Sequence, residues 1–157
     1  DAALRQVRKR VGMVFQQFNL FPHQSAIENV MEAPRHVLGL SSDAARELAR
    51  GLLDRVGLAD RLESMPHQLS GGQQQKVAVA RAIITSPKLI LADEPTGAQD
   101  PDSAWGILDL LLRENLGGTT VMVATHDRDM VRRVRKNTAI LKNGRMQLHA
   151  GEAPCRF

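Results

Sequence analysis

The sequence predicts an α/β protein with a parallel sheet and flanking helices, an inserted all-helical segment and a C-terminal β-hairpin. In the second half, short apolar runs alternate with segments of helical pattern, which is typical of parallel strands joined by helices. In the first half, a long stretch with helix caps separates two apolar runs. With 157 residues, 43% of them hydrophobic, the chain can bury a substantial core.

The first expected strand is Val11 to Phe15, a short apolar run, and a polar loop containing Pro22 follows it. The segment Ser25-Ala-Ile-Glu28 then has capping-box spacing, in which a hydroxyl and a carboxylate satisfy free backbone N–H groups reciprocally. We expect a helix to start there. It should bend or stop near Pro34, because proline lacks the N–H that a helix interior needs.

The next expected helix spans Asp43 to Val56, and Gly57 follows where a C-terminal cap belongs. The apolar residues that recur on one face are Leu48, Leu52 and Val56. We therefore expect the stretch from about Ser25 to His67 to form a separate helical subdomain.

Beyond that subdomain, Ser70-Gly-Gly-Gln73 again has capping-box spacing and opens a helix expected to run through Ile84. The run Lys88 to Ala92 is continuously apolar at its centre, which predicts a strand covered on both faces. Pro101 fits the first turn of a helix that runs to about Asn115.

The last elements are short. A β-branched strand is expected at Thr119 to Ala124, and a basic helix begins at about Arg128. Thr138 to Lys142 and Arg145 to His149, joined by Asn143-Gly144, predict a hairpin with a two-residue turn.

Composition excludes several classes of protein. The single cysteine, Cys155, rules out a disulfide framework and favours a reducing cytoplasm. No apolar run approaches the roughly 20 residues that cross a bilayer. The net charge is +4, with basic residues bunched at 5–10 and 128–136, but aromatic residues make up 3% and tyrosine is absent. Because a stacking platform is lacking, we expect no nucleic-acid partner.

Polar side chains follow the expected strands where those strands end. Gln16 follows the first, Asp93 and Glu94 end the second, and His126 comes after the third. Ligands of parallel sheets bind outside the carboxyl ends of the strands. A carboxylate at Asp93 suits Mg²⁺, whereas Glu94 can position a water aimed at a phosphate. The Gln16 amide can bond a metal-bound water, and the His126 imidazole a γ-phosphate.

The helix start Ser70-Gly71-Gly72-Gln73 has the physical properties of an anion site. Its glycines let backbone N–H groups approach an oxygen ligand, and the helix dipole adds positive charge. Taken alone, each feature has a simpler interpretation: a plain N-cap, a solvated strand end, or polar loop residues. The occurrence of all four features in this order, namely Gln16, the helix start Ser70–Gln73, the pair Asp93-Glu94 and His126, favours a nucleotide site.

With these motifs in place, the sequence resembles the ATP-binding subunits of ABC transporters over residues 4–146. The matching segments are Val14–His23 for the Q-loop, Leu69–Gln75 for the signature, Leu89–Thr96 for Walker B, Gly97–Asp100 for the D-loop, and His126 for the switch histidine.

The resemblance implies a partial RecA-like P-loop NTPase core whose cofactors are ATP and Mg²⁺. The catalytic residues it implies are Glu94, His126 and Gln16, the metal-site residues are Asp93 and Gln16, and the nucleotide-binding residues are Ser70, Gly71, Gly72, Gln73 and Asp100. The implied parts are a core strand and Q-loop at 1–24, a helical subdomain at 25–67, a signature helix at 68–86, and the remaining core with its hairpin at 87–157.

The resemblance also implies partners. Two such subunits pair head to tail, as a homodimer or with another ATPase subunit, and sandwich ATP between them. The helical subdomain and Q-loop dock on transmembrane permease subunits. We therefore expect a peripheral protein at the cytoplasmic face of the inner membrane, touching the membrane only through the permease.

Two departures from the family pattern stand out. Gln99 replaces the usual leucine of the D-loop. The phosphate loop, Gly-x₄-Gly-Lys-Ser/Thr, is absent, since no lysine follows a glycine or precedes a serine or threonine. The aromatic residue that stacks on adenine is missing too. We expect a partial sequence or a truncated gene, whose isolated product binds ATP poorly.

The transported substrate is less clear. Residues 15–75 look like polar amino-acid importers, whereas residues 91–145 look like the ATPases of lipoprotein export and cell division. We expect amino-acid import. The alternatives are the export and division type, a non-catalytic fragment that lends its signature helix or docking surface to a partner, and an ABC ATPase of translation or DNA repair. The last usually carries two cassettes or long insertions, which this chain lacks.

Overall fold

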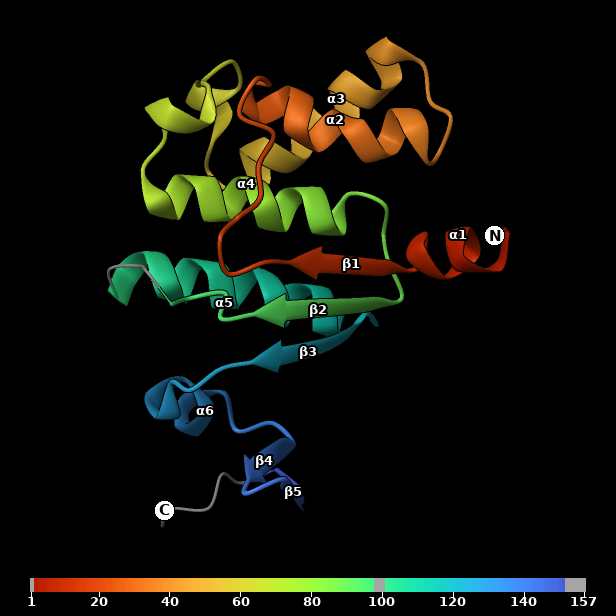
Figure 1. Ribbon diagram of the computed structural model, residues 1–157. Coiled ribbons are helices and arrows are strands. Elements are labelled where there is room, and N and C mark those ends of the chain that lie inside the picture. The colour runs from red at the N-terminus through yellow and green to blue at the C-terminus, as the bar shows by residue number, and fades with distance from the viewer. Residues whose placement is uncertain (1, 98–100, 152–157) are drawn as a thin grey trace. The chain divides into compact units, whose positions relative to one another are not determined.

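The computed structural model describes residues 2–97 and 101–151, and the chain divides into two units with the boundary between Thr125 and His126. The first unit contains α1 (Ala2–Arg8), β1 (Val11–Val14), α2 (Ala26–His36), α3 (Ser42–Arg55), η1 (Ala59–Arg61), η2 (Pro66–Gln68), α4 (Gly71–Ile83), β2 (Leu89–Asp93), α5 (Pro101–Leu116) and β3 (Thr120–Ala124) (Figure 1). The second contains α6 (Arg128–Val134), β4 (Thr138–Lys142) and β5 (Arg145–His149).

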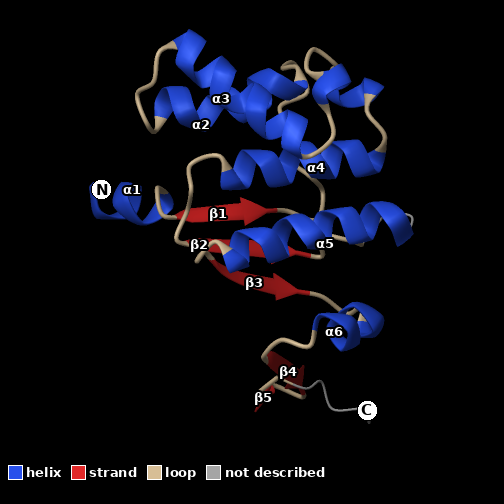
Figure 2. Ribbon diagram, turned by 180° about the vertical axis from the view of Figure 1, so that it is seen from behind, coloured by secondary structure: helices blue, strands red, loops and turns tan. Residues whose placement is uncertain are grey.

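The first unit is built on a three-stranded parallel sheet in the order β1-β2-β3. Val14 lies beside Ala92, and Ala92 beside Val123, so the three strands end at the same edge. The chain passes from β1 to β2 through α2, α3 and α4, and from β2 to β3 through α5. Helices α4 and α5 contact each other, and α5 lies across the sheet in the view from behind (Figure 2). The expected parallel sheet with helical crossovers is confirmed.

Side-chain alternation gives the sheet one covered and one open face among the described residues. Val14, Ile90 and Ala92 are buried under the helices. On the other face, Met13 and Met122 flank Leu91 in register and are 40% and 62% exposed. The expectation that Lys88–Ala92 would be covered on both faces is therefore wrong for the residues that the structure describes.

Helix α4 lies unusually close to β1 at Gly12. A Cβ built on this glycine would overlap the backbone oxygen of Ala82 and lie 3.1 Å from its carbonyl carbon and 3.2 Å from Cγ of Pro87. Only glycine leaves room for this approach. The contact fixes the height of α4 above the sheet.

Helix α2 begins and ends as expected. Ser25 forms the complete capping box with Glu28. The helix stops near Pro34, as expected, since it ends two residues later at His36. Because Pro34 lies in the last turn, it removes only one hydrogen bond near the end. Its ring is buried, and the N–H of Val37 still reaches the carbonyl of Ala33 at 2.8 Å.

Helix α3 shows a different buried face from the one its leucines indicate. Leu48 is 43% exposed, whereas Leu52 and Leu53 are buried. Ala45 and Ala49 complete the buried stripe. These small residues lie one helical turn apart and are both fully buried, so the helix turns its alanines inward. Gly57, with φ of 73°, follows the C-cap as expected.

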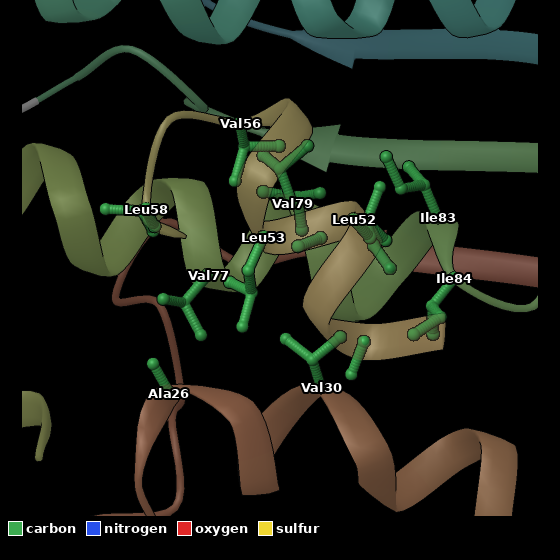
Figure 3. Close-up of a cluster of buried hydrophobic side chains, with 14 of the residues drawn as sticks. Ala26, Val30, Leu52, Leu53, Val56, Leu58, Val77, Val79, Ile83 and Ile84 are labelled. Carbon is green, nitrogen blue, oxygen red and sulfur yellow. The ribbon is translucent and has the colours of Figure 1, made fainter. Parts of the chain in front are cut away.

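A cluster of buried aliphatic side chains joins α2, α3 and α4 (Figure 3). The labelled members are Ala26, Val30, Leu52, Leu53, Val56, Leu58, Val77, Val79, Ile83 and Ile84. Fully burying one such leucine or valine stabilises the fold by about 1.5–3 kcal/mol. All helices and turns between residues 26 and 68 pack into the same compact unit as the sheet. The subdomain boundaries 25–67 stay a prediction.

The second unit holds the expected hairpin. Strands β4 and β5 pair antiparallel, and Lys142 lies opposite Arg145. Asn143 and Gly144 both have positive φ, 51° and 72°, as a two-residue type I′ turn requires. Asp127 caps the preceding helix α6 with its side chain. Within residues 2–97 and 101–151, no helix has the length and apolarity needed to cross a bilayer.

Candidate functional site

The carboxyl edge of the sheet gathers the acidic and amide residues singled out from the sequence. Asp93 ends β2, and Glu94 follows it directly. Gln16 lies two residues beyond the end of β1, the neighbouring strand. Because the strands are parallel and in register, all three residues emerge at one edge of the sheet. Asp93 and Gln16 are exposed there, and Glu94 is partly buried.

Glu94 has the most constrained position at this edge. Its backbone N–H donates to the carbonyl of Ala124 at 2.9 Å, which extends the β2–β3 pairing by one residue. Its φ of 42° lies in the left-handed region, which a residue with a side chain occupies at a cost of about 1 kcal/mol. The N–H of Gly97 closes a turn onto the Glu94 carbonyl at 3.1 Å.

The hydroxyl of Thr125 holds the side chain of Glu94. Thr125 Oγ1 donates to Glu94 Oε2 at 3.0 Å, from the end of β3 to the end of β2. A hydrogen bond to a charged acceptor stabilises by about 1.5–3 kcal/mol, so it restricts the carboxylate to a narrow range of positions. The edge therefore carries an oriented carboxylate rather than a freely rotating one.

Residues 15–24, which we call the Gln16 loop, connect β1 to α2. Phe18 and Asn19 both have left-handed backbones, with φ of 60° and 49°. The side chain of Arg81, on α4, donates to both of their carbonyl oxygens. The loop that carries Gln16 is thus shaped by a residue more than 60 positions away.

The start of α4 has the geometry expected for Ser70 to Gln73. The N–H of Gln73 donates to Ser70 Oγ at 3.3 Å, and the N–H of Ser70 donates to Gln73 Oε1 at 2.9 Å. The first N–H groups of a helix have no partner inside it. The cap takes the N–H of Gln73, and Gly72 is buried, so the exposed Gly71 carries the N–H group that a ligand anion could meet. This end of α4 lies on the same side as the strand tips (Figure 1).

Two expected site residues are not placed with this edge. His126 follows Thr125 directly, is exposed, and opens the second compact unit. Asp100 lies outside the described residues, and so does Gln99, the departure in the D-loop. The roles expected for His126 and Asp100 stay predictions.

The donor set at the sheet edge fits a magnesium ion that takes most of its ligands from elsewhere. In the described part of the chain, no group of three or more His, Cys, Asp or Glu residues comes together as a metal cage. Mg²⁺ bound with nucleotides commonly uses one or two carboxylates, with phosphate oxygens and waters as its other ligands. The exposed carboxylate of Asp93 fits that chemistry.

Sequence reasoning missed three residues that shape this site. Thr125 lies at a strand end, the same signal that singled out Gln16. Asn29 is a lone amide among the apolar residues of α2 and is fully buried. Arg81 is the one charged residue in the apolar run from Val77 to Ile84. Asn29 and Arg81 could have been found from the sequence, because each is an isolated polar residue within an apolar helix face.

Comparison with known proteins identifies the family. A model of the ABC transporter family matches residues 1–97, well over half of the chain. The chain therefore belongs to the ABC transporter family. This confirms the resemblance drawn from the Q-loop, signature and Walker B segments.

Curated relatives include cell division and glutamine transport ATP-binding proteins. The cell division ATP-binding protein FtsE of Streptococcus pneumoniae is 43% identical over 140 residues, covering 89% of this chain and 60% of the relative. The glutamine transport ATP-binding protein GlnQ of Escherichia coli is 44% identical over 142 residues, covering 90% and 59%. The GlnQ of Bacillus subtilis is 41% identical over 143 residues, covering 91% and 59%. The chain spans about 60% of the length of these relatives.

Solved structures show the same fold. A dimeric structure of the ATP-binding cassette MJ0796, in a post-hydrolysis state with ADP and Pi, has a TM-score of 0.81 and 38% identity. The match covers 94% of this chain and 66% of that one. The likeness confirms the expected RecA-like P-loop fold class.

Proposed function

We propose that this chain is the catalytic part of an ATP-binding subunit that hydrolyses ATP to drive a membrane transporter, with amino-acid import as the preferred process. The observation that carries the proposal is the alignment of Gln16, Asp93 and Glu94 at one edge of a parallel sheet. Two acids of different exposure beside an amide suit a site that holds a metal and orients a water.

Glu94 is proposed to orient the attacking water. Its carboxylate accepts a hydrogen bond from Thr125 Oγ1 through Oε2 at 3.0 Å, which orients the carboxylate at the sheet edge. Catalysis of phosphoryl transfer depends mainly on positioning and on electrostatic stabilisation. A carboxylate held by its backbone turn and by a neighbouring hydroxyl supplies that positioning.

Asp93 and Gln16 are proposed to face the metal. When bound, Mg²⁺ neutralises charge on the β- and γ-phosphates. The Asp93 carboxylate is exposed and can accept from a coordinated water or bind the ion itself. The Gln16 amide, on the next strand, can bond the same shell of water. His126 is proposed to donate to the γ-phosphate from its place directly after Thr125.

The start of α4 is proposed to serve the nucleotide of a second subunit. The exposed Gly71 at a capped helix start suits an anion, because the first N–H groups and the dipole of the helix favour negative charge. The sequence contains no Gly-x₄-Gly-Lys segment to hold the β- and γ-phosphates. A head-to-tail dimer, with itself or with another ATPase subunit, would bring the phosphates held by one subunit opposite Ser70–Gln73 of the other, and Asp100 is proposed to bind the same nucleotide.

Transmembrane permease subunits are the proposed partners, which would place the protein at the cytoplasmic face of the inner membrane. Amino-acid import is preferred because residues 15–75 resemble polar amino-acid importers. A cell-division role is the second candidate. It is favoured by the 43% identity to a cell division ATP-binding protein, which nearly equals the 44% identity to a glutamine transport protein.

A pair of chimaeras tests the function. In one, this chain replaces the 142 matching residues of the Escherichia coli glutamine transport protein, and in the other it replaces the 140 matching residues of the pneumococcal cell division protein. We expect both to hydrolyse ATP and the first to restore glutamine uptake in a strain that lacks the native subunit. Restoration of division by the second alone would assign the chain to the other group.

The role of Glu94 is tested in the same chimaera. Glu94→Gln keeps the shape of the side chain and should slow ATP hydrolysis by orders of magnitude while nucleotide binding persists. Asp109→Asn, which changes an exposed acid on α5 outside the helical subdomain, is the matched control and should leave the rate unchanged. Equal hydrolysis rates for wild type and Glu94→Gln would refute the assigned role.

A non-catalytic role is tested with the unaltered chain. Titration of ATP onto the chain alone should show weak binding, because the phosphate loop is missing from its sequence. If the chain instead lends its signature helix to a complete subunit, adding that subunit should raise ATP binding and yield a stable complex. No gain and no complex would exclude this alternative.

A further inference from the structure

The Gln16 loop has a shape that it cannot hold by itself. Phe18 and Asn19 are consecutive residues with left-handed backbones, and neither is glycine. Each such residue costs of order 1 kcal/mol and persists only when its surroundings impose the conformation. The loop also exposes its aromatic residue Phe21 to solvent at 42%. Its shape must therefore be set by contacts with the rest of the fold.

Arg81 supplies those contacts for the first half of the loop. Its Nη1 donates to the carbonyl of Asn19 at 2.7 Å, and its Nη2 donates to the carbonyl of Phe18 at 3.0 Å. The guanidinium also lies 5.7 Å from the centroid of the Phe21 ring, within the range of a cation–π contact. The planar guanidinium presents two separate nitrogens to the neighbouring carbonyls in a fixed geometry, whereas the donors of an ammonium group all lie on one freely rotating nitrogen.

The burial of Arg81 shows that this contact is more than a surface pairing. Removal from water lowers the pKa of its guanidinium, because a less polar environment disfavours the charge. Arginine nonetheless stays protonated in proteins. A partly buried cation depends on the carbonyl oxygens and the ring for compensation, so its geometry and that of the loop are fixed together.

A second residue holds the other half of the loop. Asn29, fully buried on α2, accepts from the N–H of Phe21 at 2.8 Å and donates to the carbonyls of Phe21 and Gln24 at 3.2 and 3.1 Å. The two anchors differ in what they connect. Asn29 ties the loop to the helix that follows it, whereas Arg81 ties the part next to Gln16 to α4.

Helix α4 is also the helix that begins with Ser70 and the two glycines. Arg81 lies eleven residues beyond Ser70, roughly 16 Å along a continuous helix. A helix of this length moves as a rigid body, so a shift of the loop at Asn19 is passed to the helix start. Gly12 holds the same helix against β1 at Ala82, the residue next to Arg81.

We propose that Arg81 is a positioning residue that fixes the Gln16 loop to α4, and so couples Gln16 to the helix start at Ser70. The significance of Gln16 rests on the proposed function, whereas the fixing of the loop does not. The fixing of the loop and its effect on Gln16 are therefore tested by separate measurements.

The first readout is amide hydrogen exchange in the purified protein. Arg81→Gln should speed exchange in residues 17–21 roughly tenfold or more, because the loop opens once its two hydrogen bonds are lost. Arg81→Lys, which keeps the charge and loses the fork, should give an intermediate rate and is the fallback if the glutamine variant does not fold. The control Arg113→Gln removes an exposed arginine paired with Asp109 on α5 and should leave the loop unchanged.

Two outcomes of this readout would overturn the proposal. One is unchanged exchange in residues 17–21. The other is a rise of equal size throughout the sheet and α4, which would make Arg81 an ordinary contributor to global stability. Either result decides against the loop-holding role whatever the protein is found to do.

The second readout is ATP hydrolysis in the glutamine-transport chimaera. Arg81→Gln should lower kcat with little change in the KM for ATP. Combined with Gln16→Ala it should cause little further loss, because both changes remove the same contribution. If the double variant instead showed the product of the two single decreases in kcat, Arg81 would not act through Gln16. If the unmutated chimaera lacks activity, the proposed function fails, and hydrogen exchange alone decides whether Arg81 holds the loop.

Discussion

The contact between β1 and α4 at Gly12 allows a quantitative test of the packing. Adding one methyl group, as in Gly12→Ala, places a carbon where the carbonyl oxygen of Ala82 already lies. Even its two next neighbours, 3.1 and 3.2 Å away, are about half an ångström closer than ordinary carbon contacts. The obstacle is mainly backbone, so α4 has to move away from the sheet as a unit.

The expected loss can be worked out from two opposing effects. Overpacking a well-filled core costs about 1–3 kcal/mol, and a backbone obstacle inside the main aliphatic cluster places Gly12→Ala near the top of that range. Alanine also reduces the conformational freedom of the unfolded chain relative to glycine, which stabilises the folded state by about 0.4–1 kcal/mol. The net loss is therefore about 2 kcal/mol. With a urea dependence of about 2 kcal/mol per molar, the unfolding midpoint should fall by about 1 M.

Urea unfolding followed by far-ultraviolet circular dichroism measures this loss, and Gly51→Ala provides the matched control. Gly51 lies in α3, and a Cβ there meets nothing within 4 Å. The same substitution should therefore stabilise by about 0.5–1 kcal/mol, because alanine favours a helix interior. If Gly12→Ala also raised the midpoint, the close approach of α4 to β1 would be refuted.

Two further predictions concern single hydrogen bonds. In the glutamine-transport chimaera, Thr125→Val should lower kcat roughly tenfold, because it releases the Glu94 carboxylate. Thr125→Ser keeps the hydroxyl and should keep most of the rate. Equal rates for the two variants would contradict the role of the hydroxyl. The hydrogen bonds that Ser25 donates to the carboxylate of Glu28 lower its pKa in the folded protein. These bonds therefore contribute fully to the free energy of unfolding above the ordinary pKa of 4.5, and the contribution is lost as the pH falls through the lower pKa of the folded state. Urea unfolding should therefore find wild type more stable than Glu28→Gln at neutral pH, with a gap that closes in acid; a gap independent of pH would exclude the effect.

Much of the fold follows from signals that act over a few residues. The hydroxyls of Ser25 and Ser70 cap helices by bonding N–H groups three residues ahead, so the sequence alone places both starts. Asn143-Gly144 selects its turn because both positions need positive φ. The grouping of Gln16 with Asp93 also follows, because parallel strands end at one edge.

The rest depends on distances that no local pattern encodes. Arg81 reaches backbone carbonyls 62 and 63 residues earlier, and a pattern of apolar residues gives no sign of which loop a lone cation will meet. Leu48 lies on the exposed side of α3, because the buried stripe of the helix runs through Ala45, Ala49, Leu52 and Leu53.

The open face of the sheet has a consequence for handling the protein. Met13, Leu91 and Met122 form an apolar strip across three strands, and Phe15 continues it beyond β1 with 38% exposure. Molecules that carry such a strip adhere to one another through it, and the attraction weakens on cooling and strengthens with sulfate. Turbidity at high concentration should accordingly grow with warming and with added ammonium sulfate, and cold, low-salt buffers should keep the chain dispersed.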